Sequence, residues 1–513
     1  MGKLLPFQEV CVNKLVDQPF CIVADDMGLG KTIEGMALDA ERRKKHPGAK
    51  KTLVIAPKSV VPVWVEHFAE WQPHLKVTSL DPKDRGSFLA QVKAGSHDVY
   101  IMHWDVVRLL PELATYPWFH ILADEAHRAA NREAQVTMRS KKIKRQYLTL
   151  LTGTPCTTRP EQFWSLLNWC DKKRFSSYNR FFDHHVIYVQ HQKSDFCMAN
   201  PNGVLCGKEH KNAFKVIIGV AHENELLGEI APYYIRRLKE EVLPDLPEKY
   251  YSRITVELDP QQRRVYNEMR DEMLAWIGEH EDEPLPAPMA IAKLVRLQQL
   301  AMAYAQFTPT LVRKKHEHEN TDEQKCYNDD GDLICDKVWD EKVVNKVTLI
   351  EPSSKLDAVM EILRDNPDKQ FVVFSQSKQI INLLARRLEN KGIEHGILTG
   401  DTSQEARGTI VKEFQAGRLR VFAGTISAGG VGLTLTAAST VIFIDRAWSP
   451  AHNHQAEDRC HRIGQKNAVH IIDIIARDTI DAGRLQRIES SWNFIKRLLG
   501  DKDAKIKPEG AYV

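Results

Sequence analysis

The sequence has few of the features that mark specialised classes of protein. Its 513 residues include only nine cysteines, scattered as in proteins with reduced thiols and not as in a disulfide scaffold. No stretch approaches the ~20 apolar residues that a membrane span needs. The first residues, MGKLLPFQEV, lack the apolar core of a secretion signal. We therefore expect a soluble intracellular protein.

The sequence also lacks a strong charge of either sign. A formal net charge of +3 means that any surface for nucleic acid must be local. The hydrophobic fraction of 43% and the charged fraction of 27% are typical of globular proteins. A chain of this length exceeds one ordinary core, so we expect two to four domains.

The most informative stretch lies near the N-terminus. An apolar run at residues 21–24 precedes Gly28-Leu-Gly-Lys-Thr32, and a helical pattern follows. A strand, a tight turn and a helix N-terminus together present backbone N–H groups to phosphate. The usual motif begins with Gly where this chain has Asp25, so only its second half matches. The alternative is a glycine-rich turn that carries a surface lysine.

Each residue of this turn has a chemical reason to be there. Gly28 and Gly30 allow the backbone to approach the phosphates closely. The ammonium of Lys31 can reach the β- and γ-phosphates, and the hydroxyl of Thr32 can ligate Mg²⁺. The turn therefore predicts a site for a nucleoside triphosphate.

Two acids follow about ninety residues later. The apolar stretch Phe119-His-Ile-Leu-Ala123 leads directly into Asp124-Glu-Ala-His127. At the end of a strand in a nucleotide-binding sheet, Asp124 can hold Mg²⁺ through water, and Glu125 can orient or deprotonate the attacking water. Further on, Thr152-Gly-Thr-Pro155 could sense the γ-phosphate, although a capped turn is the alternative.

Alternating strands and helices in this half predict a parallel, doubly wound sheet with its ligand at the carboxyl ends of the strands. The predicted strands cover residues 21–24, 51–57, 98–102, 119–124 and 145–151. The same alternation returns near the C-terminus, with strands at residues 371–375, 421–425 and 441–445 and a strand end and loop at residues 396–401. The fold class is therefore α/β with two such lobes.

The middle of the chain has a different character. Long amphipathic helices are predicted at residues 260–279 and 288–306, and residues 308–350 look charged and irregular. Cys197 and Cys206 flank one hairpin-like turn, and Cys326 and Cys335 flank another. Zinc ligands usually lie two to four residues apart, so we interpret both stretches as hairpins, with a zinc site as the alternative.

Two arginines stand out in the second α/β half, which has no phosphate-binding loop of its own. Arg459 and Arg462 are three residues apart, so on a helix they share a face and can point at one anion. Such arginines fit a lobe that stabilises γ-phosphate charge across a cleft. Surface salt bridges are the alternative.

Taken together and in this order, the motifs resemble those of superfamily 2 helicase-like ATPases, and within them the Snf2 family of DNA translocases. The resemblance covers Phe7 to about Ile480. The family usually has Glu at the position of Asp26, a change that keeps the acid. The stretches that carry the resemblance are Asp25-Asp-Met-Gly-Leu-Gly-Lys-Thr32, Asp124-Glu-Ala-His127, Leu151-Thr-Gly-Thr-Pro155, Ser353-Ser-Lys-Leu356 and Gln455-Ala-Glu-Asp-Arg-Cys-His-Arg-Ile-Gly-Gln465.

The resemblance implies roles for matching residues. Gln8, whose amide offers a donor and an acceptor, would read adenine, and Met27 and Leu29 would belong to the nucleotide-binding loop. Gln455 would contact the nucleotide or the bound strand, beside Arg459 and Arg462. The residues in motifs that face nucleic acid in such proteins are Lys58, Ser59, Thr154, Ser375, Thr425 and Trp448.

The implied activity is hydrolysis of ATP with Mg²⁺, stimulated by DNA and coupled to translocation on double-stranded or branched DNA. The alternatives are a strand-separating or fork-remodelling helicase, an RNA helicase, and a nucleotide-gated DNA-binding module. The sequence shows no chromatin-reading module, nuclease or long basic tail. We therefore expect a monomer in the bacterial or phage-infected cytoplasm, with a replication or recombination protein as candidate partner.

The resemblance also implies a division into two RecA-like lobes with helical protrusions and small hairpin insertions. The expected division assigns residues 1–170 to the first lobe, 171–250 to its protrusion and the inter-lobe junction, 251–350 to the helical protrusion and insertion of the second lobe, 351–490 to the second lobe, and 491–513 to a C-terminal tail or brace.

Overall fold

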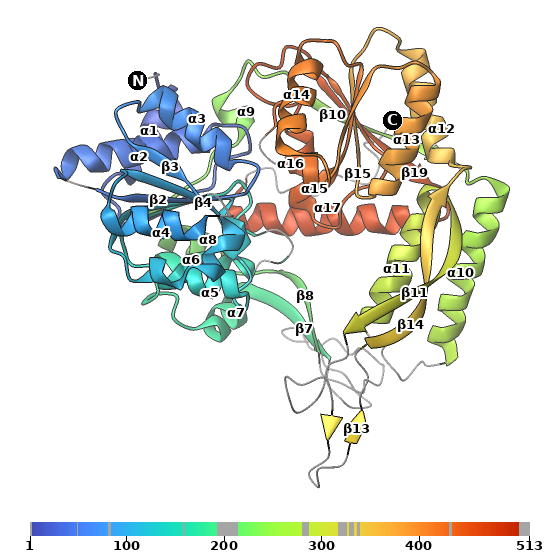
Figure 1. Cartoon of the computed structure of the whole chain (residues 1–513), viewed down its shortest axis with the longest axis horizontal. Coiled ribbons are helices and arrows are strands. Elements are labelled where there is room, and N and C mark those ends of the chain that lie inside the picture. Colours follow the sequence, from blue (N-terminus) through green and yellow to red (C-terminus); the bar gives the residue numbers. More distant parts are fainter. Residues whose placement is uncertain are drawn as a thin grey trace.

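Two lobes stand side by side in the computed structural model of the chain (Figure 1). Each lobe is built on a parallel sheet covered by helices. The structure describes residues 3–48, 50–80, 84–156, 159, 161–191, 214–279, 287–315, 326–327, 333–335, 339–429 and 433–501.

The first lobe contains a seven-stranded sheet in the order β3-β4-β2-β5-β6-β1-β9, with every pairing parallel. The five predicted strands all occur within two residues of their expected bounds. Two short strands, β3 and β9, were not predicted. The strands are β1 (Phe20–Val23), β2 (Thr52–Ala56), β3 (Val77–Ser79), β4 (Val99–His103), β5 (Trp118–Asp124), β6 (Arg145–Leu151) and β9 (Tyr234–Ile235).

Helices cover both faces of this sheet, so its central strands are inaccessible to water. Strands β2 and β5 are buried along their whole lengths, as the continuous apolar sequences of central parallel strands require. The helices are α1 (Pro6–Leu15), α2 (Lys31–Lys45), α3 (Val61–Trp71), α4 (Arg85–Ala94), α5 (Gln135–Lys142), α6 (Gln162–Cys170), α7 (Tyr178–His185) and α8 (Glu223–Ile230), with 3₁₀ turns at Trp104–Leu109, Pro111–Ala114 and Ala126–Ala129.

A buried polar cluster fixes α2, the helix that follows the phosphate-binding turn, against the sheet. His120 on β5 is completely buried, and its Nδ1 lies 2.8 Å from a carboxylate oxygen of Asp39. Its Nε2 lies 2.7 Å from a guanidinium nitrogen of Arg42 and 2.9 Å from the hydroxyl of Thr149. These contacts fit a neutral imidazole that donates from Nδ1 and accepts at Nε2. The cluster therefore holds α2 in one register on the sheet.

The second lobe contains a six-stranded parallel sheet in the order β10-β19-β18-β15-β17-β16. The predicted α/β class with two parallel sheets is confirmed. Strands β10 and β19 were not predicted. The elements are β10 (Lys249–Val256), β15 (Phe371–Ser375), β16 (His395–Leu398), β17 (Val421–Thr425), β18 (Thr440–Phe443), β19 (Val469–Ala476), α12 (Ser354–Asp365), α13 (Lys378–Asn390), α14 (Gln404–Gln415), α15 (Ile426–Gly429) and α16 (Pro450–Glu457).

Protrusions leave both lobes. From the second lobe extend the helices α10 (Pro260–Glu279) and α11 (Ala287–Met302) and a ribbon of β11 (Tyr304–Lys315) and β14 (Trp339–Ile350), paired over twelve residues (Figure 1). The second helix was expected to reach residue 306 but ends at Met302. The expectation of an irregular segment at residues 308–350 was also wrong where the structure describes it. The two strands pair with each other across a long intervening stretch, which local periodicity does not reveal.

The cysteine-flanked stretches were predicted as hairpins. In the second stretch β12 (Cys326–Tyr327) pairs with β13 (Leu333–Cys335), and Cys326 faces Cys335, so this hairpin is confirmed. Cys197 and Cys206 lie outside the described residues, between β7 (Val186–His191) and β8 (Phe214–Val220).

One group within the described ranges brings potential zinc ligands together: His184, His222 and Glu225. The two imidazole rings are stacked at 4.3 Å with planes 6° apart. Their in-plane lone pairs therefore do not converge on one ion, and Glu225 instead accepts from His184 at 3.0 Å. Within these ranges, no helix is long and apolar enough to cross a membrane.

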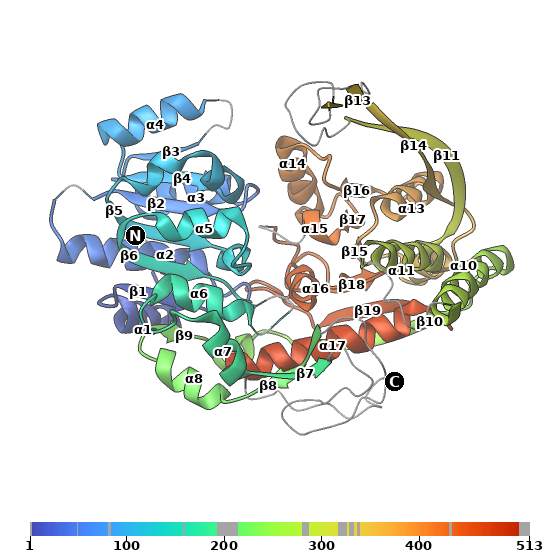
Figure 2. The ribbon, with the colours of Figure 1, turned by 90° about the horizontal axis from the view of Figure 1, so that it is seen from below.

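A single long helix connects the lobes. Helix α17 (Ile480–Leu499) starts against the second lobe and ends against the first, where Ile495, Leu498 and Leu499 enter the first core (Figures 1 and 2). Just beyond its end, Asp501 forms a buried ion pair with Arg236. The expected boundary at residue 490 therefore falls inside a helix, and the expected boundary at 170 leaves out β9, which belongs to the first sheet.

We expect the free energy of unfolding of His120→Asn to decrease less on acidification than that of the unmodified protein. Burial, with the charge of Arg42, lowers the pKa of His120 to about 4, whereas the unfolded chain takes up this proton near pH ~6.5. The contribution of His120 to the free energy of unfolding is thus complete above that pH and is lost as the pH falls toward 4.

Urea unfolding between about pH 8 and pH 4.5 measures this. At the alkaline end, the free energy of unfolding of the variant should be about 1–3 kcal/mol lower, because the hydrogen bonds of the His120 ring are lost. As the pH falls, this free energy should decrease less steeply than that of the unmodified protein. His74→Asn, at an exposed histidine, is the control and should match the unmodified protein. An unchanged acid slope in His120→Asn would contradict the assignment.

Candidate active site

The predicted phosphate-binding turn connects β1 to α2, as expected. Gly28 and Gly30 both have left-handed backbone conformations, with φ of +86° and +84°, and Gly30 is the N-cap of α2. The ammonium of Lys31, the first residue of the helix, donates to the carbonyl oxygens of Asp25 at 2.7 Å and Asp26 at 3.0 Å. The turn thus places a cation and the N-terminus of a fifteen-residue helix at one point, which suits an anion.

Space as well as backbone conformation requires glycine in this turn. A Cβ at Gly28 would lie 3.0 Å from Cγ of Arg462, and a Cβ at Gly30 would lie 2.6 Å from Nε2 of Gln8. Arg462 belongs to the second lobe, so the two lobes already touch at the turn. A side chain at either glycine would separate groups that the predicted site needs together.

Asp25, at the position where the usual motif has glycine, has a structural explanation. Its carboxylate is completely buried and accepts from Nε of Arg237 at 3.1 Å and from a second guanidinium nitrogen. Arg237 also donates to Glu34 on α2 at 2.5 Å. Burial and the nearby Asp25 raise the pKa of Glu34 to about 8, so one positive charge balances one negative charge here. The ion pair of Asp25 with Arg237 therefore links the turn to the segment between β9 and β10, which joins the two lobes.

The two acids predicted from the Asp-Glu-Ala-His motif lie at the carboxyl end of β5. The indole Nε1–H of Trp64 donates to the carboxylate of Asp124 at 2.9 Å, and that of Trp104 donates to its carbonyl oxygen at 2.8 Å. Burial and the charge of Glu125 raise the pKa of Asp124 to about 6. Burial also favours protonation of Glu125, but His127 and Lys31 outweigh it and lower its pKa to about 2. Adjacent carboxylates thus have separated pKa values, and Glu125 is firmly ionised.

Glu125 is the point at which the second lobe reaches the acids. Its backbone is left-handed, with φ of +49°, where β5 ends and the 3₁₀ turn Ala126–Ala129 begins. One carboxylate oxygen accepts from the side-chain amide of Gln455 at 2.8 Å. The other lies 3.3 Å from Nδ1 of His127 and has no hydrogen-bond partner among the described residues. That second oxygen is therefore the part of the carboxylate that Gln455 leaves without a hydrogen bond.

Both predicted arginines lie close to the turn and the acids, Arg462 beside Gly28 and Arg459 near Glu125. Arg459 and Arg462 each donate to the carbonyl oxygen of Leu433, at 3.3 Å and 2.9 Å, so one carbonyl aligns the pair. Burial and the charge of Arg462 lower the pKa of Arg459 to about 9. Burial also lowers the pKa of Arg462. Cations held close together in a buried position attract an anion strongly.

Gln8 is close to the turn but already engaged. It is 5% exposed, its amide nitrogen donates to the carbonyl oxygen of Leu29 at 3.0 Å, and its amide oxygen accepts from the backbone N–H of Leu5 at 3.0 Å. An amide has two N–H groups and two lone pairs, so one of each remains for a base. The adenine-reading role stays a prediction.

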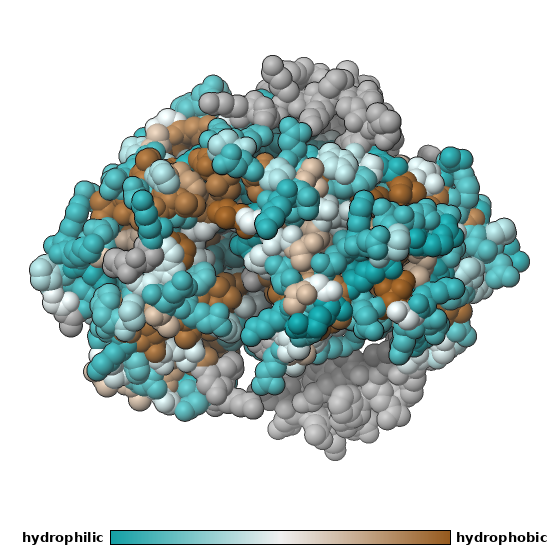
Figure 3. Space-filling model, turned by 90° about the horizontal axis from the view of Figure 1, so that it is seen from above, coloured by the Kyte–Doolittle hydropathy of each residue, from teal (hydrophilic) through white to brown (hydrophobic). Residues whose placement is uncertain are grey.

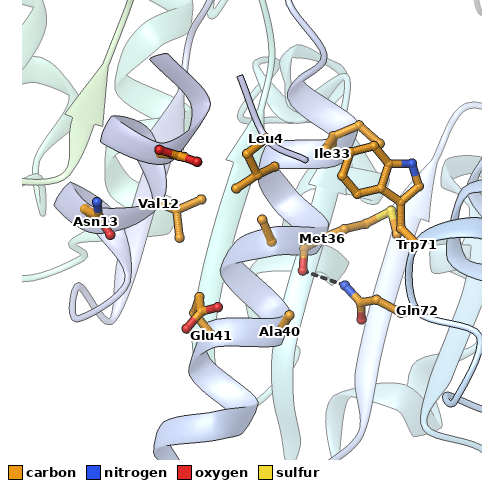
Figure 4. Close-up of a pocket in the computed structure, with 11 residues that line it drawn as sticks. Leu4, Val12, Asn13, Ile33, Met36, Ala40, Glu41, Trp71 and Gln72 are labelled. Atoms are coloured by element: carbon orange, nitrogen blue, oxygen red, sulfur yellow. Dashed lines mark hydrogen bonds between the residues drawn. The ribbon is translucent and has the colours of Figure 1, made fainter. Parts of the chain in front are cut away.

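A cavity of about 260 Å³ lies between α1, α2 and the end of α3 (Figure 4). Its lining is mainly apolar, with Leu4, Val12 and Ile33 among the contributors. Gln72 donates to the carbonyl oxygen of Met36 at 2.9 Å, while its own amide oxygen is buried without a partner within the described part of the chain. The cavity adjoins the first turn of α2, so it lies next to the predicted nucleotide loop.

The remaining predicted loop residues also lie at the turn. Met27 is buried, and its side chain is 2.9 Å from where a Cβ of Gly153 would lie, so the Thr-Gly-Thr-Pro motif packs directly on the loop. Leu29 is fully buried, and Thr32 is half-buried in the first turn of α2. The structure therefore brings together Lys31, Asp124, Glu125, Gln455, Arg459 and Arg462 around this turn.

The six residues predicted to face nucleic acid fall into two groups. Lys58 is exposed, Ser59 is half-buried and Trp448 is 39% exposed. The hydroxyl-bearing side chains of the other three are buried: Thr154, Ser375 and Thr425. Ser375, for example, donates to Asp445 inside the second lobe. Direct contact of these three side chains with nucleic acid is therefore not supported, because their hydroxyls lie inside the lobes.

Several residues that build the site were not singled out from the sequence. Trp64 and Trp104 hold Asp124, and the carbonyl of Leu433 aligns the arginines. His127 contacts both Glu125 and, at 3.2 Å, the hydroxyl of Thr152, so it connects the acids to the Thr-Gly-Thr-Pro motif. The position of His127 in the Asp-Glu-Ala-His motif was a sequence signal that could have identified it. A backbone carbonyl or a single tryptophan has no sequence pattern that points to the site.

We expect Lys31→Ala to abolish ATP turnover while the protein stays folded. The ammonium is the only cation in the turn itself, residues 24–32, and its loss removes charge stabilisation worth at least about 100-fold in turnover. Steady-state phosphate release and a melting curve measure the two effects. Turnover within tenfold of the unmodified protein would contradict a role for this lysine.

We expect Gln455→Ala to lower kcat for ATP by about 10- to 100-fold, because Glu125 loses the contact that orients it. The KM for ATP should change little, since the turn and Lys31 are untouched. Gln486→Ala, at an exposed glutamine of α17, should leave both constants unchanged. A rise in KM without loss of kcat would show that Gln455 binds the nucleotide instead.

Comparisons with known proteins agree with this geometry. Residues 10–306 match the model of the SNF2-related domain, and residues 354–464 match that of the helicase conserved C-terminal domain. The first match contains the turn and the acids, and the second contains both arginines. The two halves of the site thus lie in the two matched domains.

Individual relatives are more distant. An uncharacterized ATP-dependent helicase of Mycoplasma pneumoniae is 28% identical over 90% of this chain and 38% of its own length. The transcription regulatory protein SNF2 of Saccharomyces cerevisiae is 27% identical over 91% of this chain and 26% of its own. The chain spans between 26% and 42% of the length of the curated relatives it matches.

A solved structure of the Sulfolobus solfataricus SWI2/SNF2 ATPase core in complex with dsDNA aligns over 97% of both chains, with 21% identity and a TM-score of 0.40. At this score the alignment adds nothing to the family match. That match alone covers more than half of the 513 residues, and the chain therefore belongs to the family of proteins with an SNF2-related domain.

Proposed function

We propose that this protein is a DNA-stimulated ATPase that uses ATP hydrolysis to translocate on double-stranded or branched DNA. One observation carries the proposal: groups for hydrolysis come from both lobes and meet, with Gln455 of the second lobe 2.8 Å from Glu125 of the first. Hydrolysis in such a site depends on the lobes being together. Cycles of hydrolysis are therefore coupled to cycles of lobe movement.

The chemistry follows from the positions of the charges. The turn and Lys31 bind the phosphates, and Arg459 and Arg462 neutralise charge that develops on the γ-phosphoryl group. Glu125, ionised at neutral pH, orients the attacking water through the carboxylate oxygen that Gln455 leaves free. Thr32 and Asp124 are the oxygen donors that would hold Mg²⁺, which when bound would offset the negative charge of the phosphates.

Three features support nucleic acid as the partner of this movement. Lys58 and Arg128 are exposed at the carboxyl edge of the first sheet, beside His103. Burial lowers the pKa of His103, and the charges of Lys58 and Arg128 both act in the same direction, so each cation is within electrostatic reach of His103. Figure 3 shows that the lobes leave a hollow between them on the face seen from above. Cations at such an edge bind phosphates without reading sequence.

The names of relatives point the same way. One relative in Arabidopsis thaliana, 29% identical over 96% of this chain, is named a probable ATP-dependent DNA helicase. Strand separation is the second candidate, and it differs from translocation only in what happens to the duplex. We propose further that the protein works as a monomer in a bacterial or phage-infected cytoplasm, on substrates of replication or recombination.

Steady-state ATP turnover with different nucleic acids tests the proposal. We expect duplex or forked DNA to raise kcat at least about tenfold, equivalent to ~1.4 kcal/mol of barrier, and RNA duplex to have little effect. The stimulation should weaken as salt rises, because phosphate contacts release counterions. Lys58→Glu combined with Arg128→Glu should reduce the stimulation at equal DNA concentration.

The same preparations distinguish the alternatives. Displacement of a labelled strand from forked DNA would establish a strand-separating helicase, and displacement of a third strand from a triplex without duplex melting would establish translocation. Equal turnover with and without any DNA, in a protein that hydrolyses ATP, would overturn DNA stimulation.

A further inference from the structure

A short segment that joins the lobes has contacts that the chemistry above does not use. After β9 the chain continues through Arg236, Arg237 and Leu238 into α9 (Lys239–Val242), and it reaches the second sheet at β10. It lines one side of a cavity of about 500 Å³ that also borders Asp26, Met27 and Asp458. The segment therefore lies next to the predicted phosphate-binding turn, across this cavity.

One end of this segment is fixed to the first lobe. Arg237 pairs with Asp25 and Glu34, whose side chains are completely buried, and donates to the carbonyl oxygen of Phe7. Arg237 thus connects the helix before the turn, the turn itself and the helix after it. With three anchors, its backbone has little freedom to move relative to the turn.

Two residues later, Lys239 reaches the second lobe. Its ammonium lies 2.8 Å from the carboxylate of Asp458 and donates to the carbonyl oxygen of His461 at 2.6 Å. Its Cε lies 3.6 Å from where a Cβ of Gly28 would be, so the same side chain also packs on the turn. Asp458 immediately precedes Arg459, and His461 immediately precedes Arg462. Lys239 therefore binds beside each of the two arginines.

We propose that Arg237, which binds the first lobe, and Lys239, which binds the second, together hold the arginine-bearing segment of the second lobe against the phosphate-binding turn of the first. We call this pair of residues the clamp. Lys239 is a positioning residue in this proposal: it touches neither substrate nor reacting atoms. The proposal rests on the proposed ATP hydrolysis for its catalytic consequence, but the contact between the lobes stands independently of it.

Burial makes the contact between Lys239 and Asp458 consequential. Both side chains are almost inaccessible, at 5% and 7% exposure, and two oxygen acceptors from the second lobe satisfy the ammonium. An exposed ion pair contributes little because water screens it. When one partner of a buried pair is removed, the other charge remains without compensation. The second lobe is therefore held in one position relative to Lys239, and the arginines with it.

Lys239→Met tests the clamp, because methionine keeps most of the length of the side chain and removes the charge. The matched control is Lys249→Met. Lys249 contacts Asp458 at 3.4 Å and Glu457 at 3.0 Å, but it lies on β10, the edge strand of the second sheet, so its partners belong to its own lobe. Both variants remove a lysine that pairs with the same acid, although Lys249 is half-buried where Lys239 is buried. Only the first breaks a contact between the lobes.

We expect Lys239→Met to lower kcat for ATP by about 10- to 100-fold, because the arginines are displaced from the reacting position, with the KM for ATP changed less than about threefold. Lys239→Arg, which restores a cation, should recover part of the loss. Lys249→Met should show a smaller loss of kcat than Lys239→Met. A kcat for Lys239→Met within twofold of the unmodified protein would overturn the proposal.

Hydrogen–deuterium exchange without nucleotide gives a second measurement that does not depend on turnover. In Lys239→Met, peptides covering residues 24–32 and 455–465 should both exchange faster, whereas Lys249→Met should affect only the second. Failure of the unmodified protein to hydrolyse ATP would refute the proposed function but leave this result interpretable. Unchanged exchange in both peptides of a folded Lys239→Met protein would refute the clamp.

Discussion

The structure depends on the meeting of like charges from separate lobes. Lys31 from the first lobe lies in the same region as Arg459 and Arg462 from the second, and burial lowers the pKa of both arginines, with the charge of Arg462 adding to the effect at Arg459. Glu125 supplies part of the compensation. A triphosphate supplies more, so its binding and the approach of the lobes favour each other thermodynamically. The two sheets and the loops at their edges position these charged groups close together.

Each lobe delivers its groups by the same means. A parallel sheet, buried on both faces, ends in loops at one edge, and polar residues on those loops are positioned by the rigid strands beneath. The phosphate-binding turn follows β1, the two acids follow β5, and the arginines follow α16. Buried polar contacts, such as that of His120 with Asp39, hold the covering helices in register.

The sequence predicted which polar residues come together better than it predicted the residues that support them. Lys31, Glu125 and Arg459 were expected at one site because the roles predicted for them restrict the residue type and the local pattern, and the structure places them close together. The central strands were predicted from continuous apolar runs. The ribbon of β11 and β14 was missed because its pairing joins residues far apart in sequence. The support of Asp124 by Trp64 was missed for the same reason: a tryptophan in a helix carries no sign of its distant partner.

Helix α17 limits how the lobes can move. Its twenty residues span about 30 Å as a rigid rod, with one end packed in each lobe. A rod fixed at both ends does not permit the lobes to draw straight apart. While both ends stay packed, the movement left to the lobes is a turn about an axis near the rod. The helix is therefore a geometric constraint on any separation of Gln455 from Glu125.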